Sequence, residues 1–250
     1  MNGSNPLVKK IRDYKNLLRA VPSTVVMLLC VSIIITNLMA AKFIVQTPFV
    51  SVTGGLLLSW LPFLCMDVVT KRFGPVAAIR LNIIGVAVNL LCVGLFEIVT
   101  RIQIDTLNAV PADYSAFNSV YGCVWQILLA SSIASVLSGI VNSFVNYGIG
   151  FFFKKNSSGK TAYMAQSYIS TFVGQFIDNF IFVGLLTFVF FRSPEGAKIM
   201  PVIGAAALGG LLELVTEIFF SPIGYRVLLK WEKEGVGREY IEGRKLNEKS

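Results

Sequence analysis

The chain has 250 residues, of which 54% are hydrophobic and 14% are charged, against about 25% charged residues in soluble domains. This composition excludes an ordinary soluble domain and predicts a polytopic integral membrane protein. The net charge of +8 does not indicate nucleic-acid binding, because the Lys and Arg residues gather in the two tails and in the second and fourth connections between apolar runs. The chain contains no histidine, which excludes histidine-dependent catalysis and histidine-ligated metals, so we expect no metal and no cofactor.

Residues 1–20 are polar and basic, and we interpret them as a cytoplasmic tail whose weak amphipathic pattern is typical of an interfacial helix. The first apolar run, residues 23–46, predicts a membrane-spanning helix. Asn37 lies near the middle of this run. Lys42 lies in its outer third, from which a lysine side chain can reach the membrane surface.

The second apolar run, residues 54–70, predicts a span that carries Trp60 and that Pro62 bends. Asp67 and Lys71 are four residues apart near its inner end, and this spacing predicts an ion pair on one face of the helix. The basic residues that follow indicate that this end of the span faces the cytoplasm.

The third and fourth spans are predicted from residues 77–99 and 120–153. Asn89 lies in the third span on a stripe of small and amide residues, which membrane helices use for packing as well as for polar contacts. The fourth run is longer than a perpendicular helix requires, so we expect it to tilt or to bend at one end. It carries its own small, polar stripe, which includes Ser138 and Asn142.

The fifth span, residues 163–191, is apolar but carries polar residues at helical spacing. Gln175, Asp178 and Phe182 share one face, and Asn179 lies beside them. Asp178 is near the middle of the run, where a charge costs at least ~2.5 kcal/mol on insertion scales, so its side chain should face protein or a wet cavity. Two interpretations stay open, a hydrogen-bonded anchor between helices and a polar ligand pocket, and we favour the pocket.

The sixth span is predicted from residues 200–225, with Glu213 near mid-membrane and Glu217 one helical turn further in. Residues 231–250 form a polar C-terminal tail whose extreme end we expect to be disordered. The positive-inside rule places both termini in the cytoplasm (N-in/C-in). The expected fold is therefore all-α, with residues 21–230 forming a bundle of six transmembrane helices between two cytoplasmic tails.

Short motifs in four of the predicted spans occur in a consistent order. Their residues are Asn37, Ala40 and Lys42 in the first span, Gly54, Gly55, Pro62, Asp67, Val68, Thr70 and Gly74 in and after the second, Ser170, Thr171, Gln175, Asp178, Ile181 and Phe182 in the fifth, and Pro222 and Tyr225 in the sixth. Together they resemble the queuosine precursor transporter family, also called the vitamin uptake transporter family.

The resemblance implies a multi-pass transporter in a bacterial or archaeal cytoplasmic membrane. Its substrate would be a small nucleobase-like metabolite, a queuosine precursor such as the 7-deazaguanine bases preQ0, preQ1 or queuine. The chain has no Gly-rich phosphate loop, so we do not expect it to couple to ATP by itself. Its partners would be this substrate and the lipid bilayer, and the choice between a monomer and a homodimer is left open.

A guanine-like base presents a ring N–H and an amino group side by side, and a carboxylate can accept both. This chemistry defines the candidate site. Its expected members are the acids Asp178 and Glu213, the amides Gln175, Asn179, Asn37 and Asn89, the aromatic walls Phe182 and Trp60, and the gating or structural polar residues Lys42, Asp67 and Glu217.

A second hypothesis is a substrate-binding membrane subunit of an energy-coupling-factor vitamin transporter, whose ATPases are separate chains. We rank it lower, because the first span lacks the Ala-x-x-x-Ala docking face of such subunits. An intramembrane enzyme is a third hypothesis. It is disfavoured because the chain has neither a histidine nor an ordered nucleophile–base set, so we expect no enzymatic activity.

Overall fold

The computed structural model is almost entirely helical over the residues that it describes, which are 6–40, 42–46, 51–102, 115–121, 125–152, 159–190 and 199–247. In chain order, the elements are α1 (Pro6–Ala20), α2 (Ser23–Ala40), β1 (Phe43–Gln46), β2 (Ser51–Thr53), α3 (Leu56–Phe73), α4 (Pro75–Arg101), α5 (Ser115–Tyr121), α6 (Trp125–Phe152), α7 (Lys160–Gly184), the π-helix η2 (Leu185–Phe190), α8 (Ile199–Glu234) and α9 (Arg238–Asn247).

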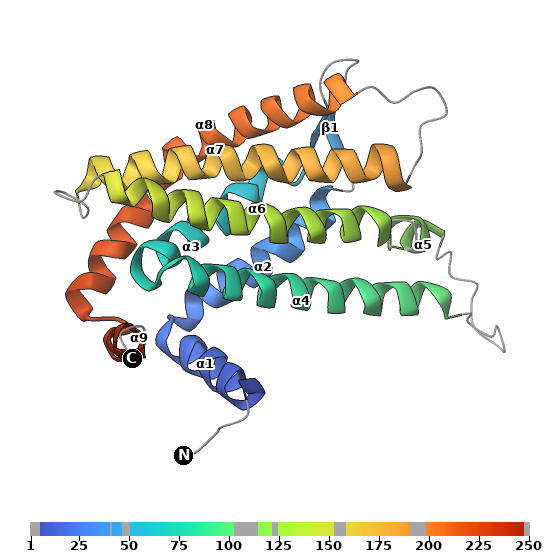
Figure 1. The fold of residues 1–250 in the computed structure, drawn as a ribbon. Helices are drawn as coiled ribbons and strands as arrows, with labels where there is room; N and C mark the ends of the chain where they lie inside the picture. Colours follow the sequence, from blue (N-terminus) through green and yellow to red (C-terminus); the bar gives the residue numbers. More distant parts are fainter. Residues whose placement is uncertain are drawn as a thin grey trace.

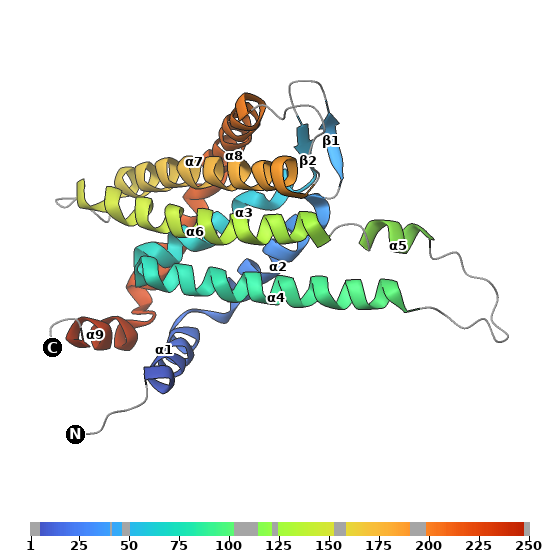
Figure 2. The same ribbon diagram turned by 45° about the vertical axis from the view of Figure 1, so that its right-hand side comes forward.

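The long helices pack side by side, with α7 between α6 and α8 (Figure 1). α6 also packs against α4, and α3 packs against α2, α4, α6 and α8. Every residue of α3 from Pro62 to Thr70 is buried, so this helix is the centre of the bundle. Figures 1 and 2 place α1, α9 and both chain ends at one end of the bundle, and the hairpin β1–β2 at the opposite end.

Among the described residues, five helices are long and apolar enough to cross a membrane. They are α2, α4, α6, α7 with its π-helical end, and most of α8. This agrees with the predicted all-α membrane protein. The predicted second span corresponds to α3, whose 18 residues include Asp67, Lys71 and Arg72. The count of six spans and their orientation stay predictions. Most of the basic fourth connection, residues 153–158, lies outside the described part of the chain.

A glycine–proline pair separates α3 from α4. Gly74 has a φ of 89°, a left-handed conformation that glycine adopts without strain. Its N–H donates to the Thr70 carbonyl at 2.9 Å and closes the last turn of α3. Pro75 then begins α4, where the missing N–H needs no partner within the helix. The chain therefore reverses at this end of the bundle with a single residue between the two helices.

The predicted first span is too long, because α2 ends at Ala40 and not at Gln46. Residues 43–46 form β1, which pairs antiparallel with β2. A short apolar run with β-branched residues suits a strand as well as a helix, so the run alone did not reveal the end of α2. Gly54 then packs closely against α2, since a Cβ atom added there would lie 2.8 Å from the Met39 carbonyl oxygen.

The predicted fourth span, residues 120–153, is divided in the structure. α5 ends at Tyr121 and α6 runs from Trp125 to Phe152, while residues 122–124 lie outside the described part. The run is longer than a bilayer needs, so one helix of 28 residues can cross while the remainder forms a separate short helix at its end.

The predicted end of the sixth span is also wrong, because α8 continues past Pro222 to Glu234. A proline removes one backbone donor, which bends a helix without ending it when neighbouring side chains hold both halves. Trp231, in the last turns of α8, is buried and packs edge-on against Phe73, with ring centroids 6.0 Å apart. Residues 238–247 of the predicted tail form α9, which the sequence did not predict, and the extreme end, 248–250, lies outside the described residues.

Candidate functional site

Residues that the sequence placed near mid-membrane meet around a cavity of about 100 Å³ between α2, α3, α6, α7 and α8. Five predicted site residues line it, namely Asn37 from α2, Asp178, Asn179 and Phe182 from α7, and Glu213 from α8. The remaining described lining residues are small, apolar or hydroxyl-bearing, and none of them is basic.

Serine hydroxyls from α6 hold two of the polar side chains in the lining. Ser138 Oγ donates a hydrogen bond to Asp178 Oδ1 at 2.8 Å. Ser131 Oγ, which also lines the cavity, donates to Asn37 Oδ1. Both contacts join different helices, so they restrict the orientation of the carboxylate and the amide before any ligand binds.

The cavity is acidic. Glu213 is only 7% exposed, and its Oε2 atom has no hydrogen-bond partner among the described residues. The negative charge of Asp178 acts on the Glu213 carboxyl group from the neighbouring helix. Two acids in a lining without a described basic side chain favour a ligand that presents N–H donors or a positive charge.

The position of Asn179 depends on a glycine of α8, Gly209, which has no side chain to occupy the space beside it. Asn179 Nδ2 donates to the Gln175 carbonyl oxygen at 2.9 Å. A Cβ atom added to Gly209 would lie 2.8 Å from that nitrogen and 2.9 Å from the Asn179 Cγ, which is closer than Cβ atoms approach other groups. Gly209 therefore provides the space in which the Asn179 amide lies beside the cavity.

Four other predicted site residues lie outside the lining. Gln175 is buried on α7, and its Nε2 atom has no hydrogen-bond partner among the described residues. Asn89 Nδ2 donates to a serine hydroxyl of α6 at 3.3 Å, which is a contact between helices. Trp60 stacks on Phe220 with ring centroids 3.6 Å apart, and Lys42 is exposed at the hairpin end.

Asp67 and Glu217 lie in a second polar cluster between α3, α7 and α8, apart from the cavity lining. Both side chains are completely buried, and both contact Ser167 of α7. The predicted ion pair between Asp67 and Lys71 is wrong, because the Lys71 ammonium group donates to Gln166 Oε1 instead. The spacing of four residues placed the two side chains on one face but did not reveal that α7 offers each of them a closer partner.

The hydroxyl groups that hold the candidate acids were not predicted as site residues. Ser138 lies on the polar stripe of α6, so helical periodicity marked its face but not the helix that it meets. Ser167 lies eleven residues before Asp178, about three turns along the same face of α7, and that spacing could have identified it.

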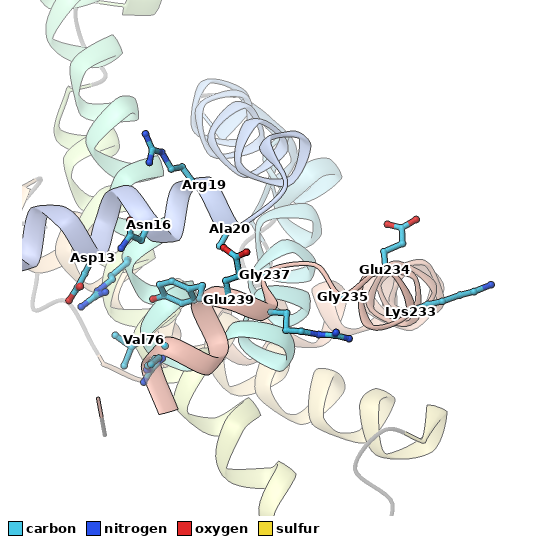
Figure 3. A pocket seen from close by; sticks show the side chains of 15 residues that line it. Asp13, Asn16, Arg19, Ala20, Val76, Lys233, Glu234, Gly235, Gly237 and Glu239 are labelled. Atoms are coloured by element: carbon cyan, nitrogen blue, oxygen red, sulfur yellow. The ribbon is translucent and has the colours of Figure 1, made fainter. Parts of the chain in front are cut away.

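A larger hollow of about 1210 Å³ lies at the end of the bundle that holds both termini (Figure 3). Its walls come from α1, the start of α4, the end of α8 and α9. Figure 3 shows side chains of both charges around it, including Asp13, Arg19 and Glu239. None of the predicted site residues lines this hollow, so we place the candidate site in the smaller cavity.

Comparison with known proteins identifies a family. A family model described as "Putative vitamin uptake transporter" matches residues 53–227, which is more than half of the chain. The matched range includes Asp67, Ser167, Asp178, Glu213 and Glu217, whereas Asn37 precedes it. Searches of curated proteins and of solved structures gave no match. The chain belongs to the vitamin uptake transporter family.

Proposed function

We propose that this chain is a secondary transporter that imports a queuosine precursor, a 7-deazaguanine base such as preQ0, preQ1 or queuine. Family membership and the apolar helices support a multi-pass membrane transporter of a small molecule. The observation that carries the substrate class is the acidic cavity, in which Asp178 and Glu213 share a described lining without a basic side chain. No ATP is hydrolysed by this chain in the proposed cycle.

The lining matches the edges of such a base. The Asp178 carboxylate can accept the ring N–H and the amino group of the guanine-like edge together. The amides of Asn37 and Asn179 can serve the base carbonyl and ring nitrogens, and the Phe182 ring offers an aromatic wall. A base with an aminomethyl group also carries an ammonium ion, for which Glu213 supplies a second acid.

We also propose that α3 is the second of six spans and that both termini face the cytoplasm of a bacterium or archaeon. The position of α3 inside the bundle supports its assignment as a span. The gathering of Lys and Arg residues in the tails and in the second and fourth connections supports the orientation. Residues 1–20 and 231–250 then flank the bundle of residues 21–230 on the cytoplasmic side.

Uptake of a labelled 7-deazaguanine base by proteoliposomes that contain only this chain tests the proposal. We expect uptake without ATP, with unlabelled guanine-like bases competing. If the chain alone binds the base but transports it only with added ATPase subunits, the energy-coupling-factor alternative is correct. If neither binding nor uptake of any 7-deazaguanine occurs, the proposed substrate class is wrong.

A further inference from the structure

A serine hydroxyl lies between two buried acids near the cavity. Ser167 Oγ of α7 is 2.5 Å from Asp67 Oδ2 of α3 and 2.5 Å from Glu217 Oε1 of α8. All three side chains are buried, with exposures of 1% for Ser167 and 0% for both acids. Glu217 is one helical turn from Glu213, which lines the cavity. The three residues are called the Ser167 cluster below.

The two short contacts require an additional proton. A serine hydroxyl carries one hydrogen, so Ser167 can donate to only one of the two carboxyl groups. Two oxygen atoms 2.5 Å apart need a hydrogen between them, because short O···O contacts of this kind are hydrogen bonds to or from a charged group. The second contact must therefore be donated by a carboxyl group to Ser167. One of the two acids is protonated in this arrangement.

The contacts indicate which acid carries the proton. Asp67 Oδ1 accepts a hydrogen bond from Asn142 Nδ2 at 3.0 Å, and an amide donor of this kind favours the ionised form of the carboxyl group. Glu217 has only the Ser167 contact, and its Oε2 atom has no partner among the described residues. The consistent arrangement is a chain in which Glu217 donates to Ser167 and Ser167 donates to the Asp67 carboxylate.

No described cation forms an ion pair with the cluster. Lys71, the basic residue that interacts with Asp67 electrostatically, donates its hydrogen bond to Gln166 instead. None of the ion pairs between described residues involves Asp67 or Glu217. Two ionised acids in this apolar interior would therefore repel one another with no ion pair to offset the repulsion. Tyr163 of α7 is 2% exposed, its hydroxyl has no hydrogen-bond partner among the described residues, and both acids act on it electrostatically.

The groups that face the Ser167 cluster come from every helix around it. They are Lys71 of α3, Tyr163 of α7, Glu232 of α8 through its charge on Lys71, and the neutral amides Asn142 and Asn146 of α6, while Cys65 of α3 faces Tyr163.

We infer that the Ser167 cluster is a proton-binding site that couples substrate movement through the adjacent cavity to the movement of one proton. This inference rests on the proposed transport function. Glu217 gives its proton to Ser167 as Ser167 gives its own to Asp67, so one O–H bond breaks and one forms at each step and a single proton crosses from α8 to α3. The link to the substrate is α8, which carries Glu217 in the cluster and Glu213 in the cavity lining.

Proteoliposomes with an imposed pH gradient test the coupling. For one proton per substrate, an inside-alkaline gradient of one pH unit should support about tenfold accumulation of a labelled 7-deazaguanine base by the wild-type chain. Glu217→Gln keeps the volume and a donor toward Ser167 but has no titratable proton. It should lose this roughly tenfold accumulation while still exchanging external for internal substrate.

Two serine variants control for packing. Ser167→Ala should lose gradient-driven accumulation and Ser167→Thr, which keeps the hydroxyl, should restore it. Ser143→Ala, at a completely buried serine of α6 outside the cluster, should accumulate like wild type. Wild-type accumulation under Glu217→Gln, or accumulation that follows a sodium gradient and ignores the pH gradient, would overturn the inference.

An infrared measurement separates this inference from the transport proposal. The purified wild-type protein should show the carbonyl band of a protonated carboxyl group, and Glu217→Gln should lose intensity from that band. If no 7-deazaguanine is transported but the band behaves in this way, the proposed substrate is wrong and the proton site stands. If the band is unchanged in Glu217→Gln, the proton site is refuted whatever the substrate.

Discussion

Replacing Asp178 with asparagine changes the charge of the cavity while leaving its volume nearly the same. The Asn oxygen can still accept the hydrogen bond that Ser138 Oγ donates at 2.8 Å, so the contact between α6 and α7 survives. The new amide nitrogen, however, is a donor placed opposite the two N–H donors of a guanine-like base. The substitution therefore acts on ligand recognition much more than on packing.

The size of the effect follows from the burial of the site. A hydrogen bond to a charged group contributes about 1.5–3 kcal/mol, which corresponds to roughly a ten- to hundredfold loss of affinity. No described basic residue in the lining can substitute for the lost charge. At substrate concentrations below the wild-type KM, we expect uptake by Asp178→Asn to fall by roughly ten- to a hundredfold.

The assay pairs initial uptake rates with thermal unfolding of the same purified protein. Asp178→Asn should unfold close to the wild-type temperature. Ser138→Ala is the matched control, because it removes the hydrogen bond to Asp178 and leaves the charge in place, so it should retain most of the uptake. If Asp178 were only an anchor between helices, the loss would appear mainly as poor folding. A stable Asp178→Asn protein that transports at the wild-type rate would refute the reasoning.

Three further expectations concern specificity, packing and topology. Competition assays should rank hypoxanthine-like analogues, which lack the amino group, about ten- to a hundredfold below guanine-like ones, and equal affinities would remove the role given to the carboxylate. Asn89→Ala should lower the free energy of unfolding by roughly 0.6 kcal/mol, which is typical of a hydrogen bond between membrane helices. The KM for the substrate should stay unchanged, and a raised KM would place Asn89 in the site. Cysteines introduced at Asp113 and Ser158 should react with impermeant reagents from outside and inside respectively, and labelling of Asp113 from the cytoplasm would exclude the six-span topology.

Helical periodicity placed two of the residues that line the cavity on one face of α7, because they are about one turn apart. Asp178 and Phe182 are four residues apart on α7, and both line the cavity together with their neighbour Asn179. The same reasoning could not separate these residues from Gln175, one turn earlier on the same face. The difference depends on which part of α8 lies opposite each turn, and this is a property of the packed bundle.

Other elements had no reliable signal in the sequence. Trp60 looked like an aromatic wall, but its ring is already stacked on Phe220, a partner more than 150 positions away. The hairpin strands and α9 are short, and over such lengths an apolar or polar run fits several conformations. Glu213 lies in the cavity lining and Glu217 in the Ser167 cluster. Which acid lies in which place depends on how α8 is rotated against α7.

Gly209 has a consequence for how the shape of the cavity can change. It lies in the lining, and the space left by its missing methyl group is occupied by the Asn179 amide. An alanine at this position would displace that amide without altering any hydrogen-bonding group or charge. A related chain could therefore change the size of this cavity through one methyl group on α8, while the two carboxyl groups of the lining stay in place.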